Sequence, residues 1–278
     1  IMGIHVIQSQ QIQVLVQGVL QTIYKPTKNP FAVLKTQHFV VPSSAIQEWL
    51  TQTLAEQQGI SANTQFHQRI RGFQWFCYQQ VLADKDHVRK ANIPRLMMKW
   101  RIYQTLKVFI DTDENLLDQA HPLFSIVQRI YDSASQLEQS VEKQLKKQSM
   151  LYWVAEQVSK LFTNYMQYRG DCSKNCESTC QCQTNWLMQW GADQALDIEQ
   201  LFPKHTEQDL SFKLNQAQDL ERWQRWLWQS IFHQDYLDMQ NIDDEFWLIM
   251  DDAEQREKAL KSLPNQVVIF TVLELPPA

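Results

Sequence analysis

A chain of 278 residues exceeds a typical single domain of about 150 residues, so one large domain or two interlocked domains are expected. No run approaches the ~18 consecutive apolar residues of a membrane span and no signal peptide follows Met2, which favours a cytoplasmic protein without a membrane partner. The net charge of −5 argues against a free-standing nucleic-acid-binding protein, although residues 69–107 hold nine basic residues against two acidic ones.

The first part of the chain predicts a strand at residues 4–8, a helix at 11–24, a second strand at 37–41 and a helix at 43–57. A long helical middle follows, with patterns at 73–82, 94–110, 123–148, 150–168, 185–201, 214–233 and 243–263. At the end, QVVIFTVLEL is a β-branched apolar run of the kind that is buried on both faces of a parallel sheet. The clustered tryptophans 223, 226 and 228 are expected to pack these helices together.

These elements predict a predominantly helical α/β fold with a parallel sheet. The last strand needs neighbours, so it should return beside the first two strands, with the helices inserted between them. The expected domains are a split α/β domain at 1–85 plus 264–278 and a helical insertion at 86–263. A parallel sheet would normally continue into another helix after residue 275, so the chain is expected to be a fragment of a longer protein.

A nucleotide-binding fold of this class would hold phosphates at a strand-to-helix turn. A P-loop needs glycines whose amides wrap the phosphates, a lysine that reaches them, and a Ser or Thr for magnesium. The expected first turn, QSQQIQ, offers none of this pattern, and the last strand ends with the lone Glu274 rather than an acidic pair. We therefore expect no ATPase motif and no nucleotide cofactor in this chain, which is itself expected to have no catalytic residues.

Four cysteines, Cys172, Cys176, Cys180 and Cys182, lie in the polar segment GDCSKNCESTCQCQ. Four thiolates this close could hold zinc or an iron–sulfur cluster. A CxxC pair is absent and CxC is uncommon around a single zinc, so a disordered or oxidised loop is favoured over a metal site. Cys77, with Phe73 and Phe76 beside it in the sequence, is interpreted as buried packing.

Five segments carry a family resemblance: FVVPSSAIQEWLTQTLAEQQGISAN, LFTNYMQYRGD, NWLMQW, ERWQRWLWQSIF and PNQVVIFTVLELPPA. In this order they resemble the N-terminal region of the exodeoxyribonuclease V gamma chain (RecC) family. The likeness runs over nearly the whole chain and is strongest at residues 39–63. It implies the first helicase-like module of a subunit whose helicase folds have lost ATP chemistry, which agrees with the missing P-loop.

The resemblance also implies partners. In this family the gamma chain binds the beta chain, a helicase and nuclease, and the alpha chain, a second helicase; ATP and magnesium are used by those chains. The gamma chain splits duplex DNA at a break and guides the 3′-ended single strand, in which a recombination hotspot sequence is sensed during repair. FVVPSSAIQEWL would then offer hydroxyls and helix amides to a DNA strand rather than to a nucleotide.

Transferred residue by residue, the resemblance places strand contacts at Ser44, Trp75, Leu161 and Arg169. Weaker candidates, whose residue types depart from the family pattern, are Pro42, Glu48, Lys160 and Thr163. Without the resemblance, core packing is favoured for Trp75 and a surface ion pair for Arg169.

Two other functions remain open. One is a structural module that only binds its sister subunits. The other is an active ATP-driven helicase module, which a Gly-Lys-Ser/Thr turn would have supported and QSQQIQ does not. Seven scattered histidines give no Ser-His-Asp or Cys-His arrangement that would indicate an independent hydrolase.

Overall fold

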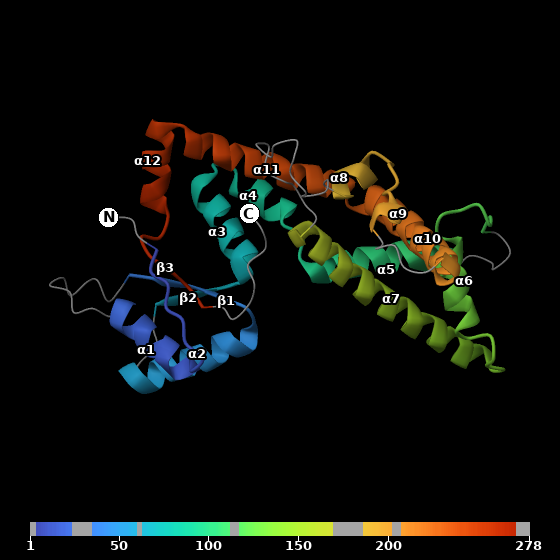
Figure 1. The fold of residues 1–278 in the computed structure, drawn as a ribbon, viewed down its shortest axis with the longest axis horizontal. Helices are drawn as coiled ribbons and strands as arrows, with labels where there is room; N and C mark the ends of the chain where they lie inside the picture. The colour runs from blue at the N-terminus through green and yellow to red at the C-terminus, as the bar shows by residue number, and fades with distance from the viewer. Residues whose placement is uncertain are drawn as a thin grey trace. The chain divides into compact units, whose positions relative to one another are not determined.

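A computed structural model describes residues 4–23, 35–59, 63–111, 117–168, 186–201 and 207–270 (Figure 1). These residues form two compact units. Unit 1 draws on Ile1–Val88 and Asp244–Glu274, and unit 2 draws on Arg89–Asp243. The fold is predominantly helical with one small parallel sheet, as the sequence predicts. Arg169, the four clustered cysteines and Glu274 lie outside the described residues.

The sheet of unit 1 has the order β2-β1-β3, with both strand pairs parallel. β1 (Gln37–Val41) is central, β2 (Thr64–Gln68) lies on one side, and β3 (Val267–Ile269) lies on the other. Phe39 of β1 is in register with Phe66 of β2 and Val268 of β3. The last strand of the described chain thus returns beside the central strand, as expected from its apolar run.

The expected strand at residues 4–8 is wrong, because the structure shows no regular element there. The sheet instead contains β2, and no element was predicted for its sequence TQFHQ. β2 lies at the edge of the described sheet and buries only His67 fully, so it lacks the continuous apolar run that marks a strand covered on both faces. The polar sequence of this edge strand is the reason that it was not predicted.

Helices cover both faces of the sheet (Figure 1). α1 (Ile12–Ile23) and α2 (Ser44–Gln58) pack on one face, where Val16, Leu50 and Leu54 meet Phe39 and Phe270. α3 (Arg69–Val81) packs on the other, where its rings meet His38 and His67. α12 (Ala253–Ser262) lies against α3, and the last part of α11 (His233–Asp251) belongs to the same unit.

Unit 2 is helical. It contains the end of α4, all of α5 to α10 and the first part of α11. The bounds are α4 Lys85–Ala91, α5 Arg95–Asp111, α6 Phe124–Asp132, α7 Ser140–Tyr168, α8 Trp186–Gly191, α9 Ile198–Leu201 and α10 Glu207–Ile231. α5 and α7 pack along each other with opposite directions, since Arg95 pairs with Glu156 while Lys99 reaches Tyr152. The core is aromatic: Phe162 meets Trp190, Trp228 and Phe232 edge-on.

The helical pattern at 123–148 is interrupted at residues 133–139, whereas the predicted break between helices was at residue 149. α6 ends at Asp132, and Ser133 and Ser135 donate hydroxyl hydrogen bonds to the carbonyls of Ile130 and Asp132. Such local bonds compete with the helical ladder and favour its end. The helix α7 then runs without interruption from Ser140 to Tyr168. Among the helices that the structure describes, none is long and apolar enough to cross a membrane.

Candidate functional site

The turn from β1 to α2 is the place where a nucleotide-binding fold would hold phosphates. Only Pro42 and Ser43 separate the strand from the helix. Ser43 is extended, with φ −156° and ψ 163°, and its Oγ accepts a hydrogen bond from the Ile46 amide at 3.4 Å, so it caps the helix. Ser44, the first helical residue, is exposed. The turn has neither the glycines nor the length to wrap a triphosphate. The exposed hydroxyl of Ser44 nevertheless lies at the N-terminus of α2, where backbone amides favour an anion.

The neighbouring strand ends at the same edge of the sheet. Val41 of β1 is in register with Gln68 of β2, and α3 begins directly after it at Arg69. Arg69 is exposed and has a φ of 64°, a left-handed value that is uncommon for a residue other than glycine. Ligands bind at the carboxyl edges of parallel strands, where helix N-termini gather. This edge, defined by Ser44 and Arg69, carries a hydroxyl and a guanidinium suited to an anionic ligand.

A buried histidine pair lies under α3. His38 Nδ1 and His67 Nε2 are 3.0 Å apart, and the rings stack with centroids at 5.3 Å. The ring of Phe76 lies within 5 Å of both imidazoles. Burial lowers the pKa of His67 to about 4, with His38 adding to the effect, and burial also lowers the pKa of His38. Both rings are therefore neutral near pH 7 and share one hydrogen bond. This pair was not predicted from the sequence, because His67 lies on β2, a strand that was not predicted.

The side chains that α3 contributes are packed rather than open. Trp75 is 5% exposed and meets Tyr78 edge-on at 5.4 Å, and Tyr78 in turn contacts Phe246. In this conformation the Trp75 ring supplies packing and offers no open stacking face. Burial raises the pKa of the partly buried Cys77 thiol to about 11, so it is protonated near neutral pH. Within the described residues, no group of three or more His, Cys, Asp or Glu side chains is arranged to hold a metal ion.

The remaining candidates divide between the units. In unit 1, Glu48 is exposed on α2 and Pro42 is half-buried. In unit 2, Lys160 is exposed and pairs with Glu156 at 3.3 Å, and Leu161 is also exposed. Thr163 is half-buried and donates its hydroxyl to the Ser159 carbonyl at 2.8 Å, which engages it within α7.

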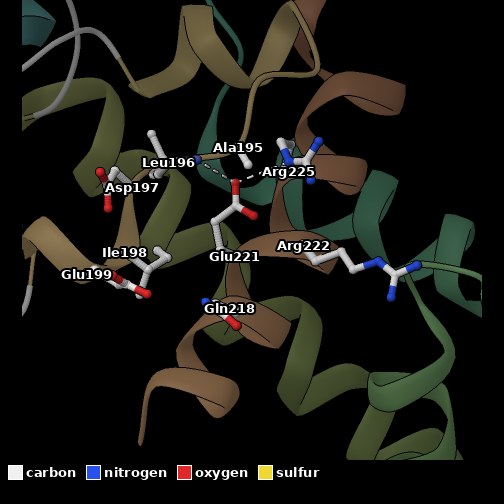
Figure 2. A pocket seen from close by; sticks show the side chains of 9 residues that line it. All are labelled: Ala195, Leu196, Asp197, Ile198, Glu199, Gln218, Glu221, Arg222 and Arg225. Carbon is white, nitrogen blue, oxygen red and sulfur yellow. Dashed lines mark hydrogen bonds and ion pairs between the residues drawn. The ribbon is translucent and has the colours of Figure 1, made fainter. Parts of the chain in front are cut away.

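A pocket of unit 2 is drawn in Figure 2. Its lining residues are Ala195, Leu196, Asp197, Ile198, Glu199, Gln218, Glu221, Arg222 and Arg225. The buried Glu221 Oε1 accepts hydrogen bonds from Trp190 Nε1 at 2.9 Å, the Leu196 amide at 3.2 Å and Arg225 Nε at 3.1 Å. Arg225 also pairs with Asp193. These contacts fix the segment after α8 onto α10, so we interpret Glu221 as a structural clamp.

Two comparisons with known proteins show the family of this chain. The family model described as "RecC, N-terminal domain" matches residues 4–278. The chain is also similar to the RecBCD enzyme subunit RecC of Haemophilus influenzae, at 23% identity over 276 residues. That match covers 94% of this chain and 20% of the relative, so the chain spans about one fifth of the relative's length. Because the family model covers nearly every residue, the chain belongs to the RecC N-terminal domain family.

Proposed function

We propose that this chain is a non-catalytic DNA-binding and scaffold module of a RecBCD-type helicase and exonuclease that processes double-strand breaks. In that role it guides the 3′-ended single strand and takes part in sensing a hotspot sequence. Its partners are DNA and the other two subunits, which supply the ATP and magnesium chemistry. Membership of the RecC N-terminal domain family supports this role.

The observation that carries the proposal is the turn from β1 to α2. Because residues 4–8 form no strand, this turn, and not QSQQIQ, is the first strand-to-helix turn of the described sheet. It has no glycine and no lysine, and the Ser43 hydroxyl caps helix α2 by accepting a hydrogen bond from the Ile46 amide. An active helicase module is thereby disfavoured, whereas exposed Ser44 and the first amides of α2 suit a phosphate of a DNA backbone.

The other candidate residues receive distinct roles. Ser44, Lys160 and Leu161 contact the strand directly, since their side chains are exposed. Trp75 acts indirectly by holding α3 in place through Tyr78. Arg169 is proposed as a strand contact on the strength of the family resemblance alone.

Ser44→Asp in the full-length protein, assembled with its partner subunits, tests this role. A carboxylate in the first turn of a helix is favourable to the helix by about 0.3–1 kcal/mol, but it repels a phosphate. We expect unchanged folding and a several-fold weaker affinity for single-stranded DNA, with the loss shrinking as salt is raised. Ser140→Asp makes the same change at the first residue of α7 and should leave the affinity unchanged.

Two outcomes would favour the alternatives. If Ser44→Asp binds DNA as the unaltered enzyme does but fails to assemble with the other subunits, the purely structural module is the better account. Steady DNA-stimulated ATP hydrolysis by this chain alone would favour the active helicase module.

A further inference from the structure

One side of the α5–α7 pair exposes aromatic rings. Trp100 on α5 and Tyr152 on α7 are each 45% exposed, and their rings meet edge-on with centroids 6.1 Å apart. Tyr103 extends the group, with its ring 5.5 Å from that of Trp100. Large aromatic side chains that gather on a surface mark a place where a partner binds. α5 and α7 pack along each other within unit 2, so these rings form one surface.

Positive charge surrounds these rings. Lys99 Nζ donates a hydrogen bond to the Tyr152 hydroxyl at 2.7 Å and lies 3.3 Å from Glu156 Oε2. Arg95 and Lys160 lie 3.7 Å and 3.3 Å from Glu156 Oε1. The hydrogen bond to Tyr152 raises the pKa of Lys99, which keeps it charged. Three cations therefore share one carboxylate, and the group carries an excess of positive charge in a chain whose net charge is −5.

We infer that the α5–α7 surface, defined as Arg95, Lys99, Trp100, Tyr152, Glu156 and Lys160, binds single-stranded nucleic acid. The inference rests on the proposed function and extends its strand contact at Lys160 to the aromatic rings of α5 and α7. Proteins bind single strands by stacking bases on aromatic rings while cations follow the phosphates. Trp100 and Tyr152 supply the rings, and Arg95 and Lys160, whose side chains are exposed, supply the phosphate contacts.

The charges favour nucleic acid over a protein partner. The cores of protein–protein interfaces are depleted in charged residues, and Lys and Glu in particular are scarce there. Here Lys99 and Glu156 lie directly beside the rings, and Lys99 Nζ lies 4.3 Å from the centre of the Tyr152 ring. A polyanion with flat bases matches both features, whereas an apolar protein surface would leave the excess positive charge without a partner.

The test uses the full-length protein in its assembled complex and a dye-labelled single-stranded oligonucleotide of mixed sequence. Trp100→Leu keeps an apolar side chain but removes the stacking face, so the affinity should fall about 5- to 150-fold. Trp100→Phe keeps a ring and should retain most of the affinity, which separates stacking from a folding defect. Trp247→Leu changes a tryptophan that is 54% exposed in unit 1 and should have no effect. Arg95→Gln should weaken the salt dependence, making the negative slope of log affinity against log salt less steep by about 0.7.

The outcomes separate this inference from the proposed function. If Trp100→Leu and Arg95→Gln bind DNA normally while Ser44→Asp weakens binding, the α5–α7 inference is wrong and the proposed function stands. If Trp100→Leu leaves DNA affinity unchanged but lowers the yield of assembled complex, the surface binds protein and the inference is also wrong. If neither Trp100→Leu nor Ser44→Asp affects DNA binding, both proposals fail. A loss with Trp100→Leu alone supports the α5–α7 surface and removes Ser44 from the strand path.

Discussion

Acid should loosen unit 1 through the His38–His67 pair. The pKa of His67 is about 4 in the folded chain against an ordinary value of 6.5. Between these two pH values the unfolded chain therefore binds a proton at His67 that the folded chain does not bind. The stabilisation is complete above about pH 6.5 and is lost as the pH falls towards 4. The two values differ by about 2.5, and each unit is worth about 1.4 kcal/mol, so the full loss is about 3 kcal/mol. About 2 kcal/mol of it should be gone by about pH 5.

Hydrogen exchange of peptides that cover β1 and β2, read by mass spectrometry and corrected for intrinsic rates, measures this loss as a change in opening free energy. His67→Phe places a non-titrating ring beside Phe73 and Phe76 and should remove the part of the pH dependence that His67 contributes. The same change leaves His38 without its partner and should lower stability near neutral pH by about 1–3 kcal/mol. His87→Phe, at an exposed position of α4, should keep the unaltered profile. Equal protection of β1 and β2 at about pH 7.5 and about pH 5 would refute the reasoning.

Three further predictions concern packing and the cysteines. Glu221→Ala should destabilise unit 2 by about 3 kcal/mol in chemical denaturation, because Arg225 and Trp190 lose their acceptor, whereas Glu199→Ala in the same pocket should stay within about 0.5 kcal/mol. Trp75→Ala should cost unit 1 about 3–5 kcal/mol whether or not DNA is present; an effect on DNA binding without a loss of stability would instead indicate a direct contact. Elemental analysis of the purified chain decides between the two interpretations of the four clustered cysteines: zinc or iron bound in proportion to protein, and lost on their joint change to serine, supports a metal site, and its absence supports a loop without metal.

The sheet shows what local sequence can and cannot predict. FVV in β1 and VVI in β3 are apolar runs, and both strands were predicted, as was the return of the chain to form a parallel pair. β2 was missed because TQFHQ is polar, and the strand that was predicted at residues 4–8 does not form. QSQQIQ, which begins at residue 8, was therefore expected to be the first strand-to-helix turn, where a phosphate loop would lie. The first strand-to-helix turn of the described sheet is Pro42-Ser43, between β1 and α2. It also lacks glycine and lysine, so the expectation that the chain has no nucleotide site now rests on this turn.

The candidate contacts divide in the same way. Ser44 could be placed from sequence, since its exposure follows from its position at the start of a capped helix. The cluster around Glu156 could not, because Arg95 and Lys99 are more than fifty residues away and meet it only once α5 and α7 pair. Trp75 likewise packs on Tyr78, whose other ring contact is Phe246 of α11, a helix distant in the sequence. Neighbours along the chain are readable from sequence, whereas pairings between distant helices are not.

The central claim is that this chain touches the 3′-ended single strand inside the assembled enzyme. The most direct measurement is photo-crosslinking of a duplex whose 3′-ended strand carries reactive bases along its unwound end, followed by peptide mapping. We expect crosslinks to peptides that contain Ser44 and to peptides from α5 or α7 around Trp100 and Lys160, lost when the partner subunits are omitted. Crosslinks that reach the partner subunits and the remainder of the full-length chain, but no peptide of residues 4–278, would contradict the account.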